Sequence, residues 1–160
     1  MPREPEARRA QRPAEADAAR LAAALVSPER LPNPKLVGKS AMHIAQAVGI
    51  SVPEGTRALI APLAGVGRDH PLSIEKLCPV LSYYEVADWR EGCERAKQIL
   101  RYGGMGHTMS IHSRNEQVIL EFGLHKPAFR ICVNTPTTCG TTYVSSATIT
   151  PIATSVTIAG

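Results

Sequence analysis

Cysteine is scarce in this sequence, and its spacing excludes two common uses of the residue. The chain has four cysteines among 160 residues, and none of them forms a C-x-x-C pair. Four cysteines in mostly apolar surroundings do not make a disulfide scaffold, and without paired ligands a zinc site has no support. We therefore expect no metal site, and we expect reduced, buried thiols at the three cysteines of predicted elements, Cys78, Cys93 and Cys132.

Long apolar runs and strong charge of one sign are also missing. Residues 144–160 are apolar in places, but Ser, Thr and Pro interrupt them, so they do not make a membrane span. The net charge of +4 is spread along the chain, which argues against a nucleic-acid partner. No signal peptide opens the sequence, and its first thirty residues mix arginine with glutamate, unlike a transit peptide. We expect a cytoplasmic protein that binds neither nucleic acid nor membrane.

The composition is that of an ordinary globular domain. Hydrophobic residues make up 44% of the chain and charged residues 20%, and 160 residues are enough to bury a core without disulfides or metal. No internal repeat is present. We expect a flexible N-terminal segment at 1–15, a folded portion at 16–140 and a divergent tail at 141–160.

Two helices are predicted in the first third of the chain. Residues 14–27 are rich in Ala and Leu, with Leu21 and Leu25 one turn apart on a single face. Residues 40–48 repeat the helical spacing at Met42, Ala45 and Val48, and the glycine that follows is suited to end this helix.

From residue 56 onward, strand and helix patterns alternate. Asp88 is placed to cap one helix, and Ser113, three residues before Glu116, is placed to cap another. Short apolar strands joined by crossover helices predict an α/β fold, with a mostly parallel sheet and helices packed on it. The expected strands are 56–63, 79–86, 107–113 and 128–135, and the expected helices are 89–104 and 114–126.

The histidines and glycines near residue 105 give no strong functional signal. His107 and His112 are separated by an odd number of residues, so along a strand they face opposite sides, which argues against a joint metal or relay role. The glycines of "YGGMGH" follow a helix instead of opening one, which favours a helix stop over a phosphate-binding loop.

Three motifs resemble a known family. The stretches "IEKLCPVLSYY", "GMGHTMSIHSRNEQVILEFGL" and "FRICVNTPTTCG" are similar to the aldehyde dehydrogenase superfamily, and most of all to its CoA-acylating branch. Within that branch the chain resembles the acetaldehyde and propionaldehyde dehydrogenases associated with bacterial microcompartments and the sulfoacetaldehyde dehydrogenases. The resemblance covers roughly residues 15–140. It implies a C-terminal part of a catalytic domain that oxidises an aldehyde to an acyl-CoA with NAD and coenzyme A, in a family of homo-oligomers.

The resemblance also implies a cofactor-binding residue. The family's Glu-x-x-x-Pro-Val signature is matched by Glu75, Pro79 and Val80, and its glutamate hydrogen-bonds the ribose next to the nicotinamide. A carboxylate suits this task, because it accepts hydrogen bonds from the two vicinal hydroxyls that the ribose donates. Leu77 occupies the position of an aromatic residue beside the nicotinamide in many relatives. The alternative for Glu75 is a solvated loop carboxylate flanked by Lys76.

Two residues match the wall of the family's substrate pocket. Asn134 and Thr135 follow a predicted strand at the corresponding position. The alternative is a simple turn, because an Asn-Thr-Pro sequence favours one through the asparagine side chain and the fixed φ of proline.

Other parts of the family pattern are missing. None of the four cysteines matches the catalytic nucleophile, and no glycine-rich dinucleotide fingerprint is present. After residue 140 nearly all the glycines of the family pattern are lost. We therefore expect the isolated chain to be inactive. A non-catalytic remnant or partner-binding α/β domain is the alternative, and a small hydrolase with Cys139 as nucleophile is a third, weaker hypothesis because no base lies near that cysteine in the sequence.

Overall fold

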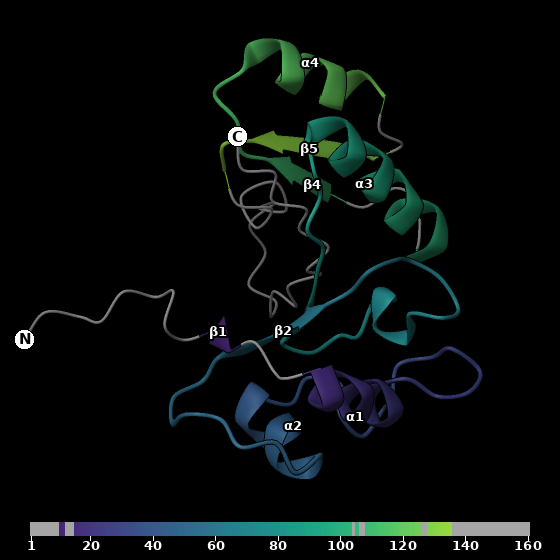
Figure 1. The fold of residues 1–160 in the computed structure, drawn as a ribbon, viewed down its shortest axis with the longest axis vertical. Coiled ribbons are helices and arrows are strands. Elements are labelled where there is room, and N and C mark those ends of the chain that lie inside the picture. The colour runs from purple at the N-terminus through teal and green to yellow at the C-terminus, as the bar shows by residue number, and fades with distance from the viewer. Residues whose placement is uncertain (1–9, 12–14, 104, 106–107, 126–127, 136–160) are drawn as a thin grey trace, which may run out of the picture. The chain divides into compact units, whose positions relative to one another are not determined.

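The structure is a computed structural model that describes residues 10–11, 15–103, 105, 108–125 and 128–135. It divides into two compact units, Met1–Tyr83 and Tyr84–Gly160. Figure 1 shows the helices and strands of each unit. Most of the N-terminal segment and all of the tail at 141–160 lie outside the described residues, and so do His107 and Cys139.

A parallel three-stranded sheet with the order β1-β2-β3 organises the first unit. β2 pairs with β3 in a register that sets Leu59 beside Val80. Side chains of β2 alternate between half-buried and buried, as expected for a strand with one face on the core. The elements of this unit are β1 (Ala10–Gln11), α1 (Glu15–Leu25), α2 (Ala41–Ala47), β2 (Ala58–Pro62), the 3₁₀ helix η2 (Pro71–Ser73) and β3 (Val80–Tyr83).

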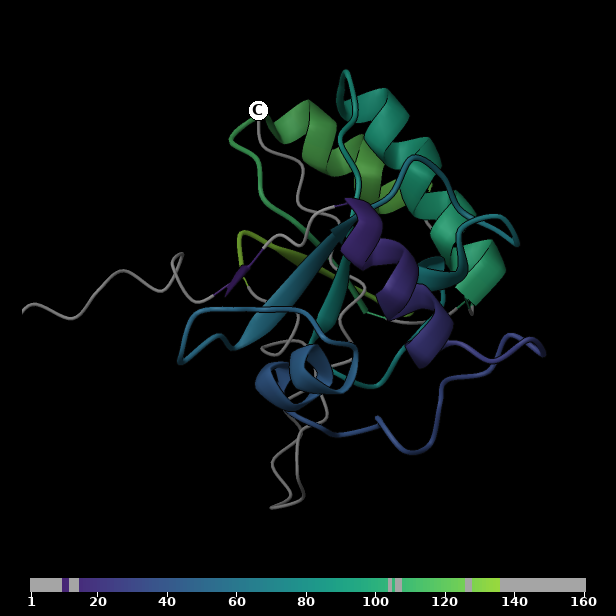
Figure 2. The ribbon, with the colours of Figure 1, turned by 60° about the horizontal axis from the view of Figure 1, so that its bottom comes forward.

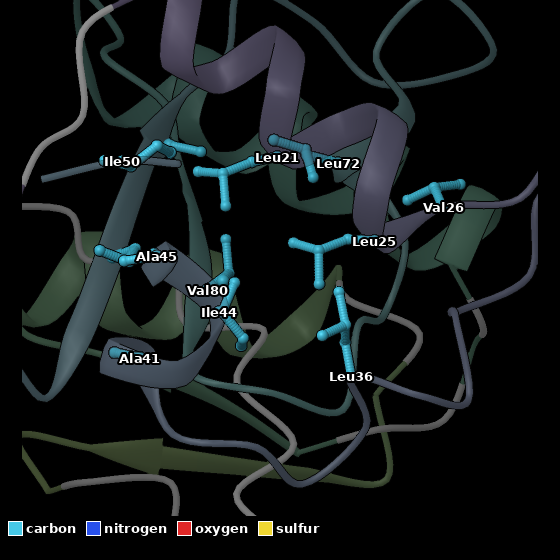
Figure 3. Close-up of a cluster of buried hydrophobic side chains, with 12 residues drawn as sticks. Leu21, Leu25, Val26, Leu36, Ala41, Ile44, Ala45, Ile50, Leu72 and Val80 are labelled. Atoms are coloured by element: carbon cyan, nitrogen blue, oxygen red, sulfur yellow. The ribbon is translucent and has the colours of Figure 1, made fainter. Parts of the chain in front are cut away.

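The two helices of the first unit cover one face of this sheet. Figure 2 shows α1 and α2 in front of β2 after the molecule of Figure 1 is turned. Side chains from both helices, from η2 and from the strands converge in one apolar cluster (Figure 3). Its fully buried members include Leu21, Leu25, Ile44, Leu72 and Val80. η2 and the start of β3 are thereby fixed to the core.

α2 begins and ends as predicted, but it buries a different face. The Ser40 hydroxyl accepts a hydrogen bond from the His43 amide, and Gly49 adopts a φ of +71°, which glycine tolerates at a helix end. The buried residues are Ala41, Ile44 and Ala45, whereas Met42 is 37% exposed. Ala41 and Ala45 lie one turn apart, with Ile44 beside them on the same face, and the larger Ile44 fills the core.

The second unit contains a two-stranded parallel sheet with its own apolar cluster. β4 pairs with β5 in a register that sets Met109 beside Ile131. Both helices contribute to the cluster, in which Ala96, Ile111 and Phe122 are fully buried. The elements are α3 (Trp89–Gly103), β4 (Thr108–Ile111), α4 (Glu116–Leu124) and β5 (Arg130–Val133).

The caps of the two helices in this unit show where local sequence is decisive. The Asp88 carboxylate accepts hydrogen bonds from the amides of Arg90 and Glu91, which confirms Asp88 as a cap. The prediction that Ser113 caps α4 is wrong. Asn115 is the cap, with its side-chain oxygen accepting from the amides of the second and third helical residues at 3.1 and 3.2 Å. Asparagine directly before the helix satisfies these donors, and Ser113 instead accepts from the Asn115 amide.

The predicted α/β class is confirmed, since all the strand pairs of the named sheets are parallel and helices pack on them. Within the described residues, the strands form one sheet in each unit. No helix of the described part is long and apolar enough to cross a membrane.

Candidate functional site

The segment of residues 74–79, between η2 and β3, holds the predicted cofactor residues and is called the Glu75 loop below. Its start is fixed by Leu72, which is buried in the core, and by Ser73, whose hydroxyl accepts from the Gly67 amide at 3.1 Å. Its end is fixed by Pro79, whose carbonyl accepts from the Leu59 amide on β2 at 2.9 Å. Proline suits this first position of the strand pairing because its lack of an N–H costs no ladder hydrogen bond there.

Glu75 is half-buried, and one of its carboxylate oxygens is unsatisfied. Oε1 is buried and has no hydrogen-bond partner among the described residues. A buried acceptor without a partner is unfavourable and rare in folded proteins, so its presence calls for an explanation. A carboxylate oxygen that needs a donor fits a ligand hydroxyl, and this fits the ribose contact that the motif implies better than it fits a solvated loop carboxylate.

The sequence indicates only a charge flanking Glu75 at Lys76, yet Lys76 is buried. It is 8% exposed, and its ammonium donates to the carbonyl of Leu72 at 2.6 Å, the carbonyl of Ile74 at 2.9 Å and the hydroxyl of Ser82 at 2.8 Å. Burial lowers the pKa of Lys76 to about 8, while the nearby Cys78 and Glu75 act in the opposite direction. Its place directly before an apolar run is the one sequence feature that hints at an inward lysine.

Leu77 and Cys78 complete the turn into β3. Leu77 has a φ of +53°, which is unusual for a residue other than glycine, and its carbonyl accepts from the Gly38 amide at 2.9 Å. Burial raises the pKa of the Cys78 thiol, and the backbone of Val80 and the charge of Lys76 offset this only in part. Cys78 is therefore a reduced thiol that resists ionisation and lacks the character of a nucleophile.

Asn134 and Thr135 lie together at the end of β5, in the second unit. The side chain of Asn134 makes two hydrogen bonds to the Ser113 backbone, both at 3.0 Å: Nδ2 donates to the carbonyl, and Oδ1 accepts from the N–H. Asn134 has a φ of +53°. The Thr135 carbonyl accepts from the buried Ser110 hydroxyl at 2.5 Å. These contacts give Asn134 the turn role that its sequence also suggested, while its backbone and that of Thr135 are fixed beside the loop after β4.

The remaining candidates form no further site in the described part of the chain. His112 is exposed, with Nε2 3.3 Å from the Ser110 hydroxyl. No group of three or more His, Cys, Asp or Glu side chains that could hold a metal occurs among the described residues. Glu75 and Leu77 thus share one loop, and Asn134 and Thr135 share another in the other unit.

Comparisons with known proteins point to one family. No family model matches the sequence. The chain is 39% identical over 108 residues to the aldehyde-alcohol dehydrogenase of Streptococcus pneumoniae, covering 68% of this chain and 12% of that protein. The chain thus spans about an eighth of the length of this curated relative.

Solved structures agree with the sequence match. An acetylating aldehyde dehydrogenase from Geobacillus thermoglucosidasius has a TM-score of 0.77 and 39% identity, covering 82% of this chain and 29% of that chain. A propionaldehyde dehydrogenase from the fucose utilisation microcompartment of Clostridium phytofermentans has a TM-score of 0.74, covering 88% of this chain and 31% of that chain, and at 22% identity it supports the fold alone. The relatives of this chain are thus acylating aldehyde dehydrogenases, and its α/β structure matches part of their catalytic domain.

Proposed function

We propose that this chain supplies part of the catalytic domain of a CoA-acylating aldehyde dehydrogenase, in which Glu75 orients the nicotinamide cofactor. The supporting observation is the buried Glu75 Oε1, which has no partner among the described residues. Two vicinal ribose hydroxyls would donate to this carboxylate, and such charge-assisted hydrogen bonds are short and orienting. The bound cofactor supplies the hydride acceptor, and the protein contributes its placement over the reacting carbon.

NAD is our proposed cofactor, with coenzyme A as the second substrate. The ribose that Glu75 would bind is the one next to the nicotinamide, and this part is identical in NAD and NADP. Glu75 therefore fits either dinucleotide, and NAD is preferred from the family resemblance. Leu77 would offer an apolar side chain to the nicotinamide, and Asn134 and Thr135 would form part of the wall that faces the aldehyde.

The proposed reaction converts an aldehyde, CoA and NAD to an acyl-CoA and NADH. Its nucleophile is a cysteine thiolate. Among the described cysteines, Cys93 is buried and Cys78 resists ionisation, while Cys132 lies half-buried in β5. We infer that turnover needs a nucleophile and a nucleotide-binding fold from outside these 160 residues, so the chain alone is inactive, while its Glu75 loop still contacts the nicotinamide ribose of added NAD.

Assembly and location follow the family in this proposal. We propose a cytoplasmic, homo-oligomeric enzyme. From the family resemblance we also propose that the complete enzyme is associated with a bacterial microcompartment.

The experiment compares Glu75→Gln with Glu54→Gln, a matched change of an exposed carboxylate in the same unit. Both are made in the longest reading frame that contains this chain, and NADH formation is followed with an aldehyde and CoA. We expect Glu75→Gln to lower kcat by about a hundredfold or more, because a misplaced cofactor ring reacts slowly, and Glu54→Gln to match the unaltered enzyme. Equal activity of all three proteins would overturn the role of Glu75.

A second candidate is a non-catalytic domain that binds a partner. The observation in its favour is the exposure of large apolar side chains in the second unit, with Leu120 60%, Leu124 69% and Phe129 87% exposed. NAD-dependent turnover by the complete reading frame would decide for the enzyme, and its absence would decide for the binding domain.

A further inference from the structure

The Lys76 ammonium donates all three of its protons, to acceptors that lie before and after Glu75 in the sequence. It has three protons and three acceptors, the carbonyls of Leu72 and Ile74 and the hydroxyl of Ser82. Leu72 and Ile74 precede Glu75, and Ser82 lies on β3 after the loop. The Ser82 hydroxyl also donates to the Leu72 carbonyl at 2.6 Å, so the network joins η2 directly to β3.

One of these contacts closes a small ring around Glu75. The contact from Lys76 Nζ to the Ile74 carbonyl spans residues 74–76, so the Glu75 backbone is held on both sides by the same side chain. Lys76 points inward and is buried, whereas its neighbour Glu75 is half-buried with Oε1 unsatisfied. The buried lysine thus fixes the backbone from which the free carboxylate projects.

The loop also contains a conformation that needs such support. Leu77 is held in the left-handed region, which is unfavourable for a residue with a Cβ. Strained backbone persists where the surrounding contacts over-determine it, and here these are the Lys76 network on one side and the Gly38 to Leu77 hydrogen bond on the other. Without the ammonium, the first of these is lost.

We propose that Lys76 is a positioning residue, whose three hydrogen bonds hold the Glu75 loop so that the Glu75 carboxylate is presented in one orientation to the cofactor ribose. This inference rests on the proposed function of Glu75 and extends it to the residue beside it. Lys76 does not touch the cofactor and acts through Glu75.

The test uses the 160-residue chain and two readouts. The Hα–Hβ scalar couplings of Glu75 report whether its side chain adopts one rotamer, and the Glu75 carboxyl carbon resonance reports its response to added NAD. Lys76→Met removes all three donors. Lys97→Met is the control, because Lys97 lies on α3 in the other unit and its ammonium pairs with Glu94 at 2.6 Å.

We expect a single Glu75 rotamer in the unaltered chain and in Lys97→Met, and averaged couplings in Lys76→Met, with amide spectra outside residues 72–82 unchanged. The NAD-induced shift of the Glu75 carboxyl resonance should fall about tenfold in Lys76→Met. A small displacement of the carboxylate is enough to break its hydrogen bonds to the cofactor ribose. A general loss of stability would not produce this local change. One Glu75 rotamer and a full NAD response in Lys76→Met would overturn the inference.

Two further outcomes separate the inference from the proposed function. No NAD response in the unaltered chain or in Lys97→Met would count against the proposed function, while the couplings would still decide the role of Lys76. If Lys76→Met does not fold, Ser82→Ala takes its place, since it removes one acceptor and keeps the ammonium. Partial averaging of Glu75 in Ser82→Ala would support the inference, and an unchanged rotamer would overturn it.

Discussion

The ammonium of Lys76 lies 2.8 Å from the hydroxyl of Ser82, and both groups donate to the same carbonyl, that of Leu72, at 2.6 Å each. Within the part of the chain that the structure describes, no salt bridge compensates this buried lysine; its partners are two carbonyl dipoles and a hydroxyl. The arrangement fixes the approach to β3 by polar contacts beside the apolar core of the unit. It also makes the free energy of unfolding of this unit depend on pH in the alkaline range.

The pH dependence of unfolding follows from the lowered pKa of Lys76. Between pH about 8 and 10.5 the unfolded chain keeps a proton that the folded chain has lost, so the free energy of unfolding contributed by this group rises with pH. Over that window the gain is up to about 3 kcal/mol. Below pH 8 both states are protonated and the contribution is constant.

Urea unfolding from pH 7.5 to 10.5 measures this gain. The comparison is made between Cys78→Ser and Cys78→Ser/Lys76→Met, because the Cys78 thiol has a raised pKa and its titration would lower stability over part of the same range. The first protein should gain stability relative to the second. Parallel pH profiles would show that Lys76 keeps its proton in the folded chain.

Glu75→Gln should leave the fold intact or make it slightly more stable. The substitution removes a half-buried charge whose Oε1 has no partner, so we expect the free energy of unfolding to stay equal or to rise by up to about 1 kcal/mol. Urea unfolding of Glu75→Gln, with Glu54→Gln beside it, checks this. A loss of more than about 1 kcal/mol would mean that the carboxylate holds the fold together.

Asn134 should matter for stability through two separable effects. Asn134→Ala loses two hydrogen bonds to Ser113 and places a Cβ-bearing residue without local polar support at a φ of +53°, so we expect a loss of about 2 kcal/mol. Asn134→Gly loses the same hydrogen bonds but relieves the backbone, so about 1 kcal/mol should be lost. Equal losses, measured by denaturant unfolding, would show that the backbone conformation contributes nothing.

The exposed apolar side chains of the second unit should drive self-association of the isolated chain. Leu120 and Leu124 lie one turn apart on α4, and Phe129 precedes β5. We expect a triple change of these residues to Gln, Gln and Ser to reduce association in sedimentation velocity over rising protein concentration. Leu31→Gln is the control, since Leu31 is 62% exposed in the first unit. Concentration-independent sedimentation of the unaltered chain would contradict this expectation.

The sequence predicts a helix end correctly where a few neighbouring residues determine it. The structure confirms the predicted cap at Asp88 and the predicted helix end at Gly49. The predicted cap of α4 is wrong, because Ser113 and Asn115 both suit the role and only the path of the chain decides between them. The buried face of α2 was also misjudged, because Met42 and Ile44 are both apolar and the packing partner selects Ile44.

The candidate site was predictable in part. The Glu-x-x-x-Pro-Val pattern marks Glu75 as a candidate, but no periodicity shows that its Oε1 is buried and unsatisfied. The burial of Lys76 depends on Leu72, Ile74 and Ser82, which become acceptors for the same group only when η2 and β3 come together. A charged residue is mostly exposed in proteins, so the sequence alone favours the wrong environment for this lysine.

The most direct test of the central claim is saturation-transfer NMR with NAD and this chain. Saturation should reach the protons of the nicotinamide ribose more strongly than those of the adenine, because the only cofactor contact proposed here is that of the Glu75 loop. Glu75→Gln should abolish this pattern, and Glu54→Gln should keep it. Equal saturation of the nicotinamide ribose in Glu75→Gln and in the unaltered chain would contradict the account.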